Sequence, residues 1–270
     1  MKIDGAKIAD KILTNLQIEL SPHIFGQLAV ILIGTDKNSQ IYVNQKIKTG
    51  RKLGIPVSVY RYNTSISIDK LTKLVDKLNL DNQIQGIIIQ RPVPLNLKPD
   101  KLNLMIRSDK DVDGFHPRSL FDPPVALAIA EILKSIHPLN YLNWLKNQKI
   151  LIIGRGETAG KPIAKYFSKK CLQLHIAHSQ TSNLKKLCLA CDIIIPCVGR
   201  PNIVRHDMVK SDSILIGVGL HPEENKLRPD YQQEDIGDKV GFYTPVPGGV
   251  GPVNVAMLFK NLIKAASQTL

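Results

Sequence analysis

The chain has 270 residues, 43% of them hydrophobic and 22% charged, a length that allows a large core and most naturally two domains. No apolar run approaches the roughly 18 residues that a membrane span needs, and residues 1–13 (MKIDGAKIADKIL) lack the apolar centre of a signal peptide. We therefore expect a cytoplasmic protein with no membrane partner.

The formal net charge is +13, and a basic balance can indicate a polyanionic partner. Lys and Arg are, however, spread along the chain, and aromatic residues make up only 5% of it. Nucleic-acid binding usually needs a clustered basic patch and stacking platforms. Composition therefore favours an anionic cofactor or substrate, or plain surface charge, over nucleic acid as the main ligand.

The first half of the chain alternates strand-like and helix-like segments. Residues 27–34 (QLAVILIG) form a short apolar run that predicts a buried strand. Residues 39–53 predict a helix that Gly54 stops, with Pro56 beyond it. A strand over 57–62, a helix after the N-cap residue Ser67, and a buried strand over 84–90 follow.

The same alternation of strand-like and helix-like segments begins again at residue 149. Strands are predicted at KILIIG, LQLHIAH, CDIIIPCVG and SILIGVG, and helix-forming stretches separate the first three of them. Such alternation indicates parallel sheets covered by helices, which bind ligands at the carboxyl ends of their strands. The proline-rich stretch FHPRSLFDPP (115–124) marks a boundary between the two halves.

The cysteines do not form a metal-binding pattern. Cys188 and Cys191 make a single CxxC in an apolar stretch, whereas a zinc site needs two such pairs or a pair with spaced histidines. Buried structural thiols are the expectation.

A glycine-rich turn follows the strand over 149–153. Gly154, Gly156 and Gly160 precede a predicted helix, and glycines there let backbone N–H groups approach a pyrophosphate. The spacing is one residue longer than the usual dinucleotide fingerprint, so a plain strand-to-helix turn is the alternative. The next strand ends in AHSQTSN with no carboxylate for the ribose hydroxyls of NAD. Arg155 and Ser179 suit a 2′-phosphate instead, which favours NADP.

Tyr42 and Lys46 stand one helical turn apart, as either a solvated edge or an acid–base pair. Short-chain dehydrogenases use a Tyr-x-x-x-Lys, but there the glycine turn precedes the pair. Here the order is inverted, so that interpretation fails.

Five segments in register resemble another family over nearly the whole chain. They are SQIYVNQKIK, GIIIQRPVP, DKDVDGFHP, GRGETAGKP and PVPGGVGPVNVAML. Together they are similar to the bifunctional methylenetetrahydrofolate dehydrogenase/methenyltetrahydrofolate cyclohydrolase family. The resemblance implies oxidation of 5,10-methylenetetrahydrofolate with NADP⁺ and hydrolysis of the methenyl product to 10-formyltetrahydrofolate, with no metal.

The resemblance also implies an α/β fold of two domains with a cleft between them. The expected folate-binding catalytic domain is 1–120, completed by a C-terminal helix over 253–270. The expected Rossmann-like NADP-binding domain is 121–252. A homodimer that forms through the cofactor domain is a further implication.

Residue roles follow from the same resemblance. Lys46 corresponds to the general acid/base, Gln90 to the glutamine that holds it, Asp113 to the carboxylate that binds the pterin, and Tyr42 to the ring that stacks on it. The cofactor-binding residues would be Gly154, Arg155, Gly156, Ser179 and Leu220. The loop with Pro247, Gly248 and Gly249 would border the folate.

The segment DKDVDG also imitates the first half of a calcium loop. Leu120 stands where that loop needs a bidentate Glu, so calcium is not expected. Asp109 and Asp111 are expected to be solvated or capping residues.

The chain departs from the family pattern at several positions. PPVALA (123–128) replaces a PCTPxG segment, and the stretch before it is short. Arg91 replaces an apolar residue, Gly217 an aspartate, Asn254 a threonine and Gln180 a basic residue. The alternative hypothesis is therefore a non-catalytic or cyclohydrolase-only relative that binds NADP or folate.

Overall fold

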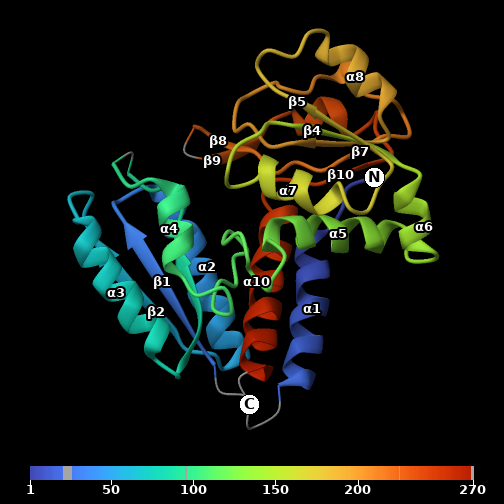
Figure 1. Ribbon diagram of the computed structural model, residues 1–270. Helices are drawn as coiled ribbons and strands as arrows, with labels where there is room; N and C mark the ends of the chain where they lie inside the picture. Colours follow the sequence, from blue (N-terminus) through green and yellow to red (C-terminus); the bar gives the residue numbers. More distant parts are fainter. Residues whose placement is uncertain (21–25, 95, 225, 269–270) are drawn as a thin grey trace. The chain divides into compact units, whose positions relative to one another are not determined.

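The structure is a computed structural model that describes residues 1–20, 26–94, 96–224 and 226–268. The chain divides into two compact units, each with a parallel sheet (Figure 1). We call Lys11–Pro124 with Val255–Leu270 the three-strand unit, and Met1–Asp10 with Val125–Asn254 the five-strand unit.

The three-strand unit holds β1 (Gln27–Ile33), α2 (Lys37–Leu53), β2 (Val57–Tyr62), α3 (Ile68–Leu80), β3 (Ile84–Ile89) and α4 (Pro99–Met105). Its strand order is β2-β1-β3, with both pairings parallel. Most of α1 (Gly5–Glu19) and of α10 (Val250–Ser267) also belongs to this unit.

Local chemistry explains the boundaries of the two central helices. Asp36 caps α2 by accepting a hydrogen bond from the Ser39 N–H at 2.7 Å, so the helix begins two residues before the expected start. Gly54 ends the helix in the left-handed region, at φ 70°, as predicted. Ser67 caps α3, as predicted, and accepts from the Lys70 N–H at 3.3 Å.

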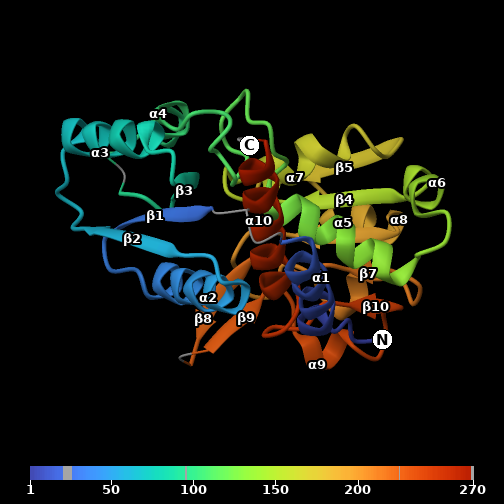
Figure 2. The same ribbon diagram turned by 90° about the horizontal axis from the view of Figure 1, so that it is seen from below.

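Helices cover both faces of the three-stranded sheet. The α3 and α4 side packs on Ala29, Ile31 and Ile33 of β1 and on alternate residues of β3. Figure 2 shows α3 and α4 on one side of the sheet and α2 on the other. On that other side, close contacts at Gly50 and Gly86 involve Phe259 and Leu262, so α10 also covers this face. With both faces buried, the strands read as continuous apolar runs, as expected for a parallel sheet.

The five-strand unit holds α5 (Pro124–Ile136), α6 (Tyr141–Lys146), β4 (Lys149–Ile153), α7 (Gly160–Phe167), β5 (Gln173–Ala177), α8 (Leu184–Ala190), β6 (Ile193–Pro196), η1 (His206–Met208), β7 (Ile214–Leu215), β8 (Leu220–Glu223), β9 (Lys226–Pro229), α9 (Gln233–Ile236) and β10 (Phe242–Tyr243). The main sheet has the order β10-β7-β6-β4-β5, all parallel, and β8 and β9 form a separate antiparallel hairpin. The strands predicted at KILIIG and LQLHIAH are confirmed over Lys149–Ile153 and Gln173–Ala177, whereas only two residues of SILIGVG are in a strand.

The unit boundaries differ from those expected in two ways. The division falls after Pro124 rather than after residue 120, and α10 begins at Val250 and enters the three-strand unit at Val255. The first ten residues belong to the five-strand unit, whereas the expected first domain, 1–120, included them. The cause is a backbone pairing, in which the Ile3 N–H donates to Tyr243 O at 2.8 Å and the Tyr243 N–H donates to Met1 O at 3.0 Å. Residues 269 and 270, the end of the expected C-terminal helix, lie outside the described residues.

Within the described residues, no helix combines the length and the apolar character that a membrane crossing requires. Cys188 and Cys191 are 0% and 1% exposed in the core of the five-strand unit. Burial raises the pKa of the Cys188 thiol to about 12, so the CxxC consists of structural thiols, as predicted.

Candidate active site

The side chain of Lys46 is buried on α2 at the centre of the candidate site. Only 8% of the residue is exposed, because Lys46 follows Val43 by three positions on the face that α2 turns toward the core. Its Nζ donates a hydrogen bond of 2.7 Å to Oε1 of Gln90. Burial lowers the pKa of Lys46, while the negative charge of Asp113 acts in the opposite direction.

Gln90 reaches this lysine because it directly follows β3, at the carboxyl end of the three-stranded sheet. Its backbone N–H donates to Ile31 O at 2.9 Å, which continues the pairing with β1. Its Nε2 donates to Arg91 O at 2.9 Å, so the amide is oriented with its oxygen toward Lys46. The glutamine therefore fixes both the position and the hydrogen-bond geometry of the lysine.

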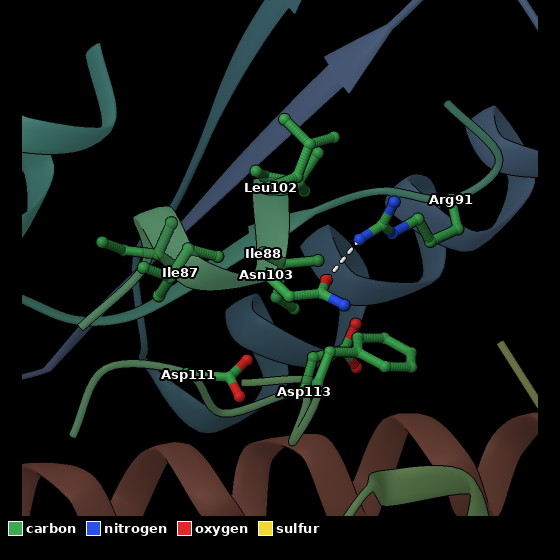
Figure 3. Close-up of a pocket in the computed structure, with 10 residues that line it drawn as sticks. Ile87, Ile88, Arg91, Leu102, Asn103, Asp111 and Asp113 are labelled. Carbon is green, nitrogen blue, oxygen red and sulfur yellow. Dashed lines mark hydrogen bonds between the residues drawn. The ribbon is translucent and has the colours of Figure 1, made fainter. Parts of the chain in front are cut away.

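Asp113 belongs to the loop after α4 and lines a small pocket that also contains Asp111, Arg91 and Asn103 (Figure 3). Burial raises the pKa of Asp113, and the charges of Lys46 and Arg91 lower it. Asp113 thus shares this pocket with Arg91, and the charge of Lys46 also acts on its carboxyl group.

The loop of Asp113 is supported from two sides. Asp111 is 2% exposed and accepts from the His116 N–H at 2.7 Å, and burial raises its pKa to about 6. Asn261 of α10 donates to Val112 O and Asp122 O, at 3.0 and 2.9 Å. Asp109, in contrast, is partly exposed and forms an ion pair with Arg107. Asp109 is thus solvated and Asp111 caps the loop, as expected for these two residues.

Tyr42 lies one turn before Lys46 and is half-buried. Burial raises the pKa of its hydroxyl, so the residue remains a neutral ring at physiological pH. Such a ring is suited to stacking rather than to proton transfer.

The glycine turn between β4 and α7 has the close packing that a phosphate cradle needs. Gly154 has φ 118° and donates its N–H to Ala177 O at 2.8 Å. A side chain at Gly160 would overlap the carbonyl group of Gly154, whereas one at Gly156 would meet nothing within 4 Å. The turn is therefore tight at its base and open above Gly156, and Arg155 is exposed beside it.

Two more of the expected cofactor residues lie at neighbouring strand ends. Ser179 is exposed just after β5, which pairs with β4. Leu220, at the start of β8, is half-buried, and its carbonyl oxygen lies against Gly199 of the loop that follows β6. No acidic side chain follows β5 within residues 178–183. The residues present fit a 2′-phosphorylated dinucleotide better than an unphosphorylated one.

Sequence reasoning missed the residue that shapes the loop after β6. Asp230 is fully buried and accepts from the N–H groups of Val198 and Arg200, at 2.7 and 2.9 Å. It lies 30 residues or more from these partners along the chain, so no local pattern indicates the contact.

The structure explains one departure from the family pattern. A Cβ at Gly217 would lie 2.7 Å from the ring of Tyr231, whose hydroxyl donates to Thr244 O. Glycine is needed here because the tyrosine occupies the space. At a second departure, PPVALA, the stretch contains the start of α5, with Pro124 at its first position and Ala126 and Ala128 buried.

Pro247, Gly248 and Gly249 form a turn before α10, with a cis Val246–Pro247 peptide. Gln233 holds this turn, because its amide accepts from the Val246 N–H at 2.8 Å and donates to Val246 O at 3.1 Å. These residues belong to the five-strand unit, and their contact with folate stays a prediction.

Comparison with known proteins gives the same assignment for both halves. Residues 3–113 match the catalytic domain of the tetrahydrofolate dehydrogenase/cyclohydrolase family, and residues 123–270 match its NAD(P)-binding domain. The bifunctional protein FolD of Campylobacter hominis is 36% identical over 282 residues, covering 99% of this chain and 98% of the relative.

Solved structures agree. The bifunctional FolD methylenetetrahydrofolate dehydrogenase/cyclohydrolase of Campylobacter jejuni is 34% identical, with a TM-score of 0.93 over 100% of this chain and 99% of the other. The FolD enzyme of Trypanosoma brucei, solved with NADP cofactor and an inhibitor, is 26% identical, with a TM-score of 0.90 over 99% and 97% of the two chains.

Proposed function

The chain belongs to the tetrahydrofolate dehydrogenase/cyclohydrolase family, and we propose that Lys46, Gln90 and Asp113 carry out its folate chemistry. The observation that supports this most strongly is the 2.7 Å hydrogen bond between the buried Lys46 amine and Gln90, beside the Asp113 carboxylate. Burial lowers the pKa of Lys46, which brings the gain and loss of a proton by its amine closer to neutral pH.

The enzyme oxidises 5,10-methylenetetrahydrofolate to the methenyl cation with NADP⁺, and then hydrolyses this cation to 10-formyltetrahydrofolate. In the hydrolysis, water adds to the methenyl carbon and the bond from that carbon to N5 breaks, with net release of one proton. Lys46 accepts a proton from the attacking water as the amine and can return it to N5 as the ammonium. Gln90 keeps the amine aimed during this exchange.

Asp113 and Tyr42 hold the substrate in this proposal. A carboxylate accepts two parallel N–H groups, which matches the amino and ring N–H edge of the pterin. Tyr42 stacks on the ring system and fixes its angle to Lys46. The turn at Pro247, Gly248 and Gly249 offers backbone that can approach a flat ligand.

The glycine turn and its neighbours hold the cofactor. Gly154, Gly156 and the first turn of α7 would take the pyrophosphate, Arg155 and Ser179 the 2′-phosphate, and Leu220 an apolar contact. NADP⁺, when bound, supplies the acceptor for the hydride of the methylene group.

One assay tests both activities. Protein, 5,10-methylenetetrahydrofolate and NADP⁺ are mixed, and NADPH and methenyltetrahydrofolate are followed by absorbance. We expect both to form and the methenyl signal then to decay faster than in buffer. Methenyl hydrolysis without NADPH formation would support the cyclohydrolase-only alternative, and neither activity would support a non-catalytic relative.

Arg155→Ala should shift the cofactor preference. Loss of a charge-assisted contact to the 2′-phosphate should reduce kcat/KM for NADP⁺ about tenfold and leave that for NAD⁺ nearly unchanged. Steady-state rates with both cofactors measure this, with the exposed Lys169→Ala as a control for net charge. Equal use of NADP⁺ and NAD⁺ by the unmodified enzyme, unchanged in Arg155→Ala, would contradict the assignment.

The proposal also includes the formation of a homodimer and a cytoplasmic location. Strand β5 lies at an edge of the five-stranded sheet. Leu172, just before this strand, is 68% exposed, and Ile176, within it, is 48% exposed. An exposed apolar edge of this kind is suited to contact with a second copy of the chain. All four cysteines are free thiols, as is usual in reducing compartments. Light scattering and cell fractionation test these two points.

A further inference from the structure

Arg91 places a permanent positive charge in the small pocket that Asp113 also lines. It follows Gln90 in the chain and occupies a position where the family pattern has an apolar residue. Its side chain lines the same pocket as Asp111 and Asp113, and Figure 3 shows its guanidinium directed toward the Asn103 amide.

The arginine is held at both ends. Its backbone carbonyl accepts from Ser39 Oγ at 3.1 Å and from Gln90 Nε2 at 2.9 Å. At the other end, Nη2 donates to Asn103 Oδ1, and the guanidinium lies 5.8 Å from the centre of the Phe115 ring. A long side chain fixed in this way acts at a defined place and not as a mobile surface charge.

A permanent charge matters here because the charge of Lys46 changes during the reaction. Lys46 must lose its proton to act as a base, and Asp113 then loses one of its two positive neighbours. Arginine does not deprotonate in proteins, so its charge persists through the cycle. A carboxylic acid, unlike a carboxylate, could not accept both N–H groups of the pterin edge.

We propose that Arg91 is a positioning residue that keeps Asp113 in its charged, pterin-binding form while Lys46 gives up and regains its proton. The inference deepens the proposed function and rests on the roles given there to Asp113 and Lys46. The charge of Arg91 lowers the pKa of Asp113 against the effect of burial, which agrees with this role.

Three charged groups face Asp113: Lys46 from α2, Arg91 from the segment after β3, and Asp111 from its own loop. The pocket residues from α4 are Leu102 and Asn103, and Ile106 follows the helix; all three are uncharged. Burial raises the pKa of Asp111 to about 6, so the test compares variants with the unmodified enzyme at each pH and does not use a single profile.

The test measures the dissociation constant of tetrahydrofolate, which carries no one-carbon unit and so does not react, from about pH 6 to 8. Arg91→Met removes the charge, Arg91→Gln removes it but keeps a donor for Asn103, and Arg91→Lys keeps it. Without the charge the pKa of Asp113 rises, so binding should weaken as the pH falls. For both neutral variants we expect affinity close to that of the unmodified enzyme at pH 8, and weaker than it by a factor that grows as the pH falls and that a one-unit rise in pKa limits to about tenfold. Arg91→Lys should restore the unmodified profile, and the exposed Arg61→Met should follow it throughout.

The variant Asp113→Asn distinguishes a failure of the proposed role of Asp113 from a failure of the inference about Arg91. If Asp113→Asn binds tetrahydrofolate as tightly as the unmodified enzyme, the proposed role of Asp113 is wrong and the role of Arg91 falls with it. If Asp113→Asn binds weakly but the neutral Arg91 variants follow the unmodified profile, shifted by the same factor at every pH, only the inference about Arg91 is overturned.

Discussion

Lys46→Met should reduce the rate of methenyltetrahydrofolate hydrolysis about 10²- to 10⁴-fold, the usual contribution of a general acid–base group. Methionine fills a similar space but cannot exchange a proton. Because Asp113 and Tyr42 remain, tetrahydrofolate should still bind. Decay of the methenyl absorbance measures the rate, and equilibrium binding measures the affinity.

Lys48→Met is the matched control for this experiment. Lys48 lies on the same helix, two residues further on, but is exposed, so its replacement removes the same charge outside the site. Its hydrolysis rate should stay within about twofold of the unmodified rate. Retained turnover in Lys46→Met would remove the acid–base assignment. The hydrolysis rate of the unmodified enzyme should also rise with pH, because burial lowers the pKa of Lys46 and only the amine acts as a base.

Gly160→Ala should impair the dehydrogenase and spare the hydrolysis. The added methyl group would overlap the backbone carbonyl of Gly154 and approach the Arg155 Cα to 3.0 Å, so the turn must shift where it would hold the pyrophosphate. Displacements of about 1 Å at such sites can cost about a hundredfold in rate. NADPH formation at varied NADP⁺ concentrations measures the loss.

Hydrolysis of methenyltetrahydrofolate by the same variant is the internal control, because that step needs no hydride acceptor. Gly156→Ala provides a comparison, since its methyl group meets no protein atom within 4 Å and should leave the backbone in place. An unchanged KM for NADP⁺ in Gly160→Ala would show that the turn does not hold the cofactor.

The sequence was a good guide where structure depends on near neighbours. The buried strand β1, the end of α2 at Gly54 and the N-cap at Ser67 follow from short apolar runs and from local backbone chemistry. The hydrogen bond between Lys46 and Gln90 agrees with the roles that the family resemblance implied, although the spacing of Tyr42 and Lys46 alone left a solvated edge open.

The features that the sequence did not predict depend on contacts between residues far apart in the chain. Asp230 shapes a loop from another strand, Asn261 supports the loop of Asp113 from the far end of the chain, and residues 1–3 pair beside Tyr243. In each case the partners are distant in the sequence and meet only in the folded chain, and nothing in the residues around either partner indicates the other. The space that Tyr231 fills above Gly217 is a similar case.

The place of α10 has a consequence for the order in which the protein can fold during synthesis. Leu262 lies against Gly86 of β3 and Phe259 against Gly50 of α2, yet both leave the ribosome only after all of residues 125–254. Until then the part of the three-stranded sheet's face which α10 covers is open, although α2 lies on the same side (Figure 2), and exposed apolar surface is prone to aggregation. We therefore expect the nascent three-strand unit to need a chaperone, or to remain loosely packed, while the five-strand unit is being translated.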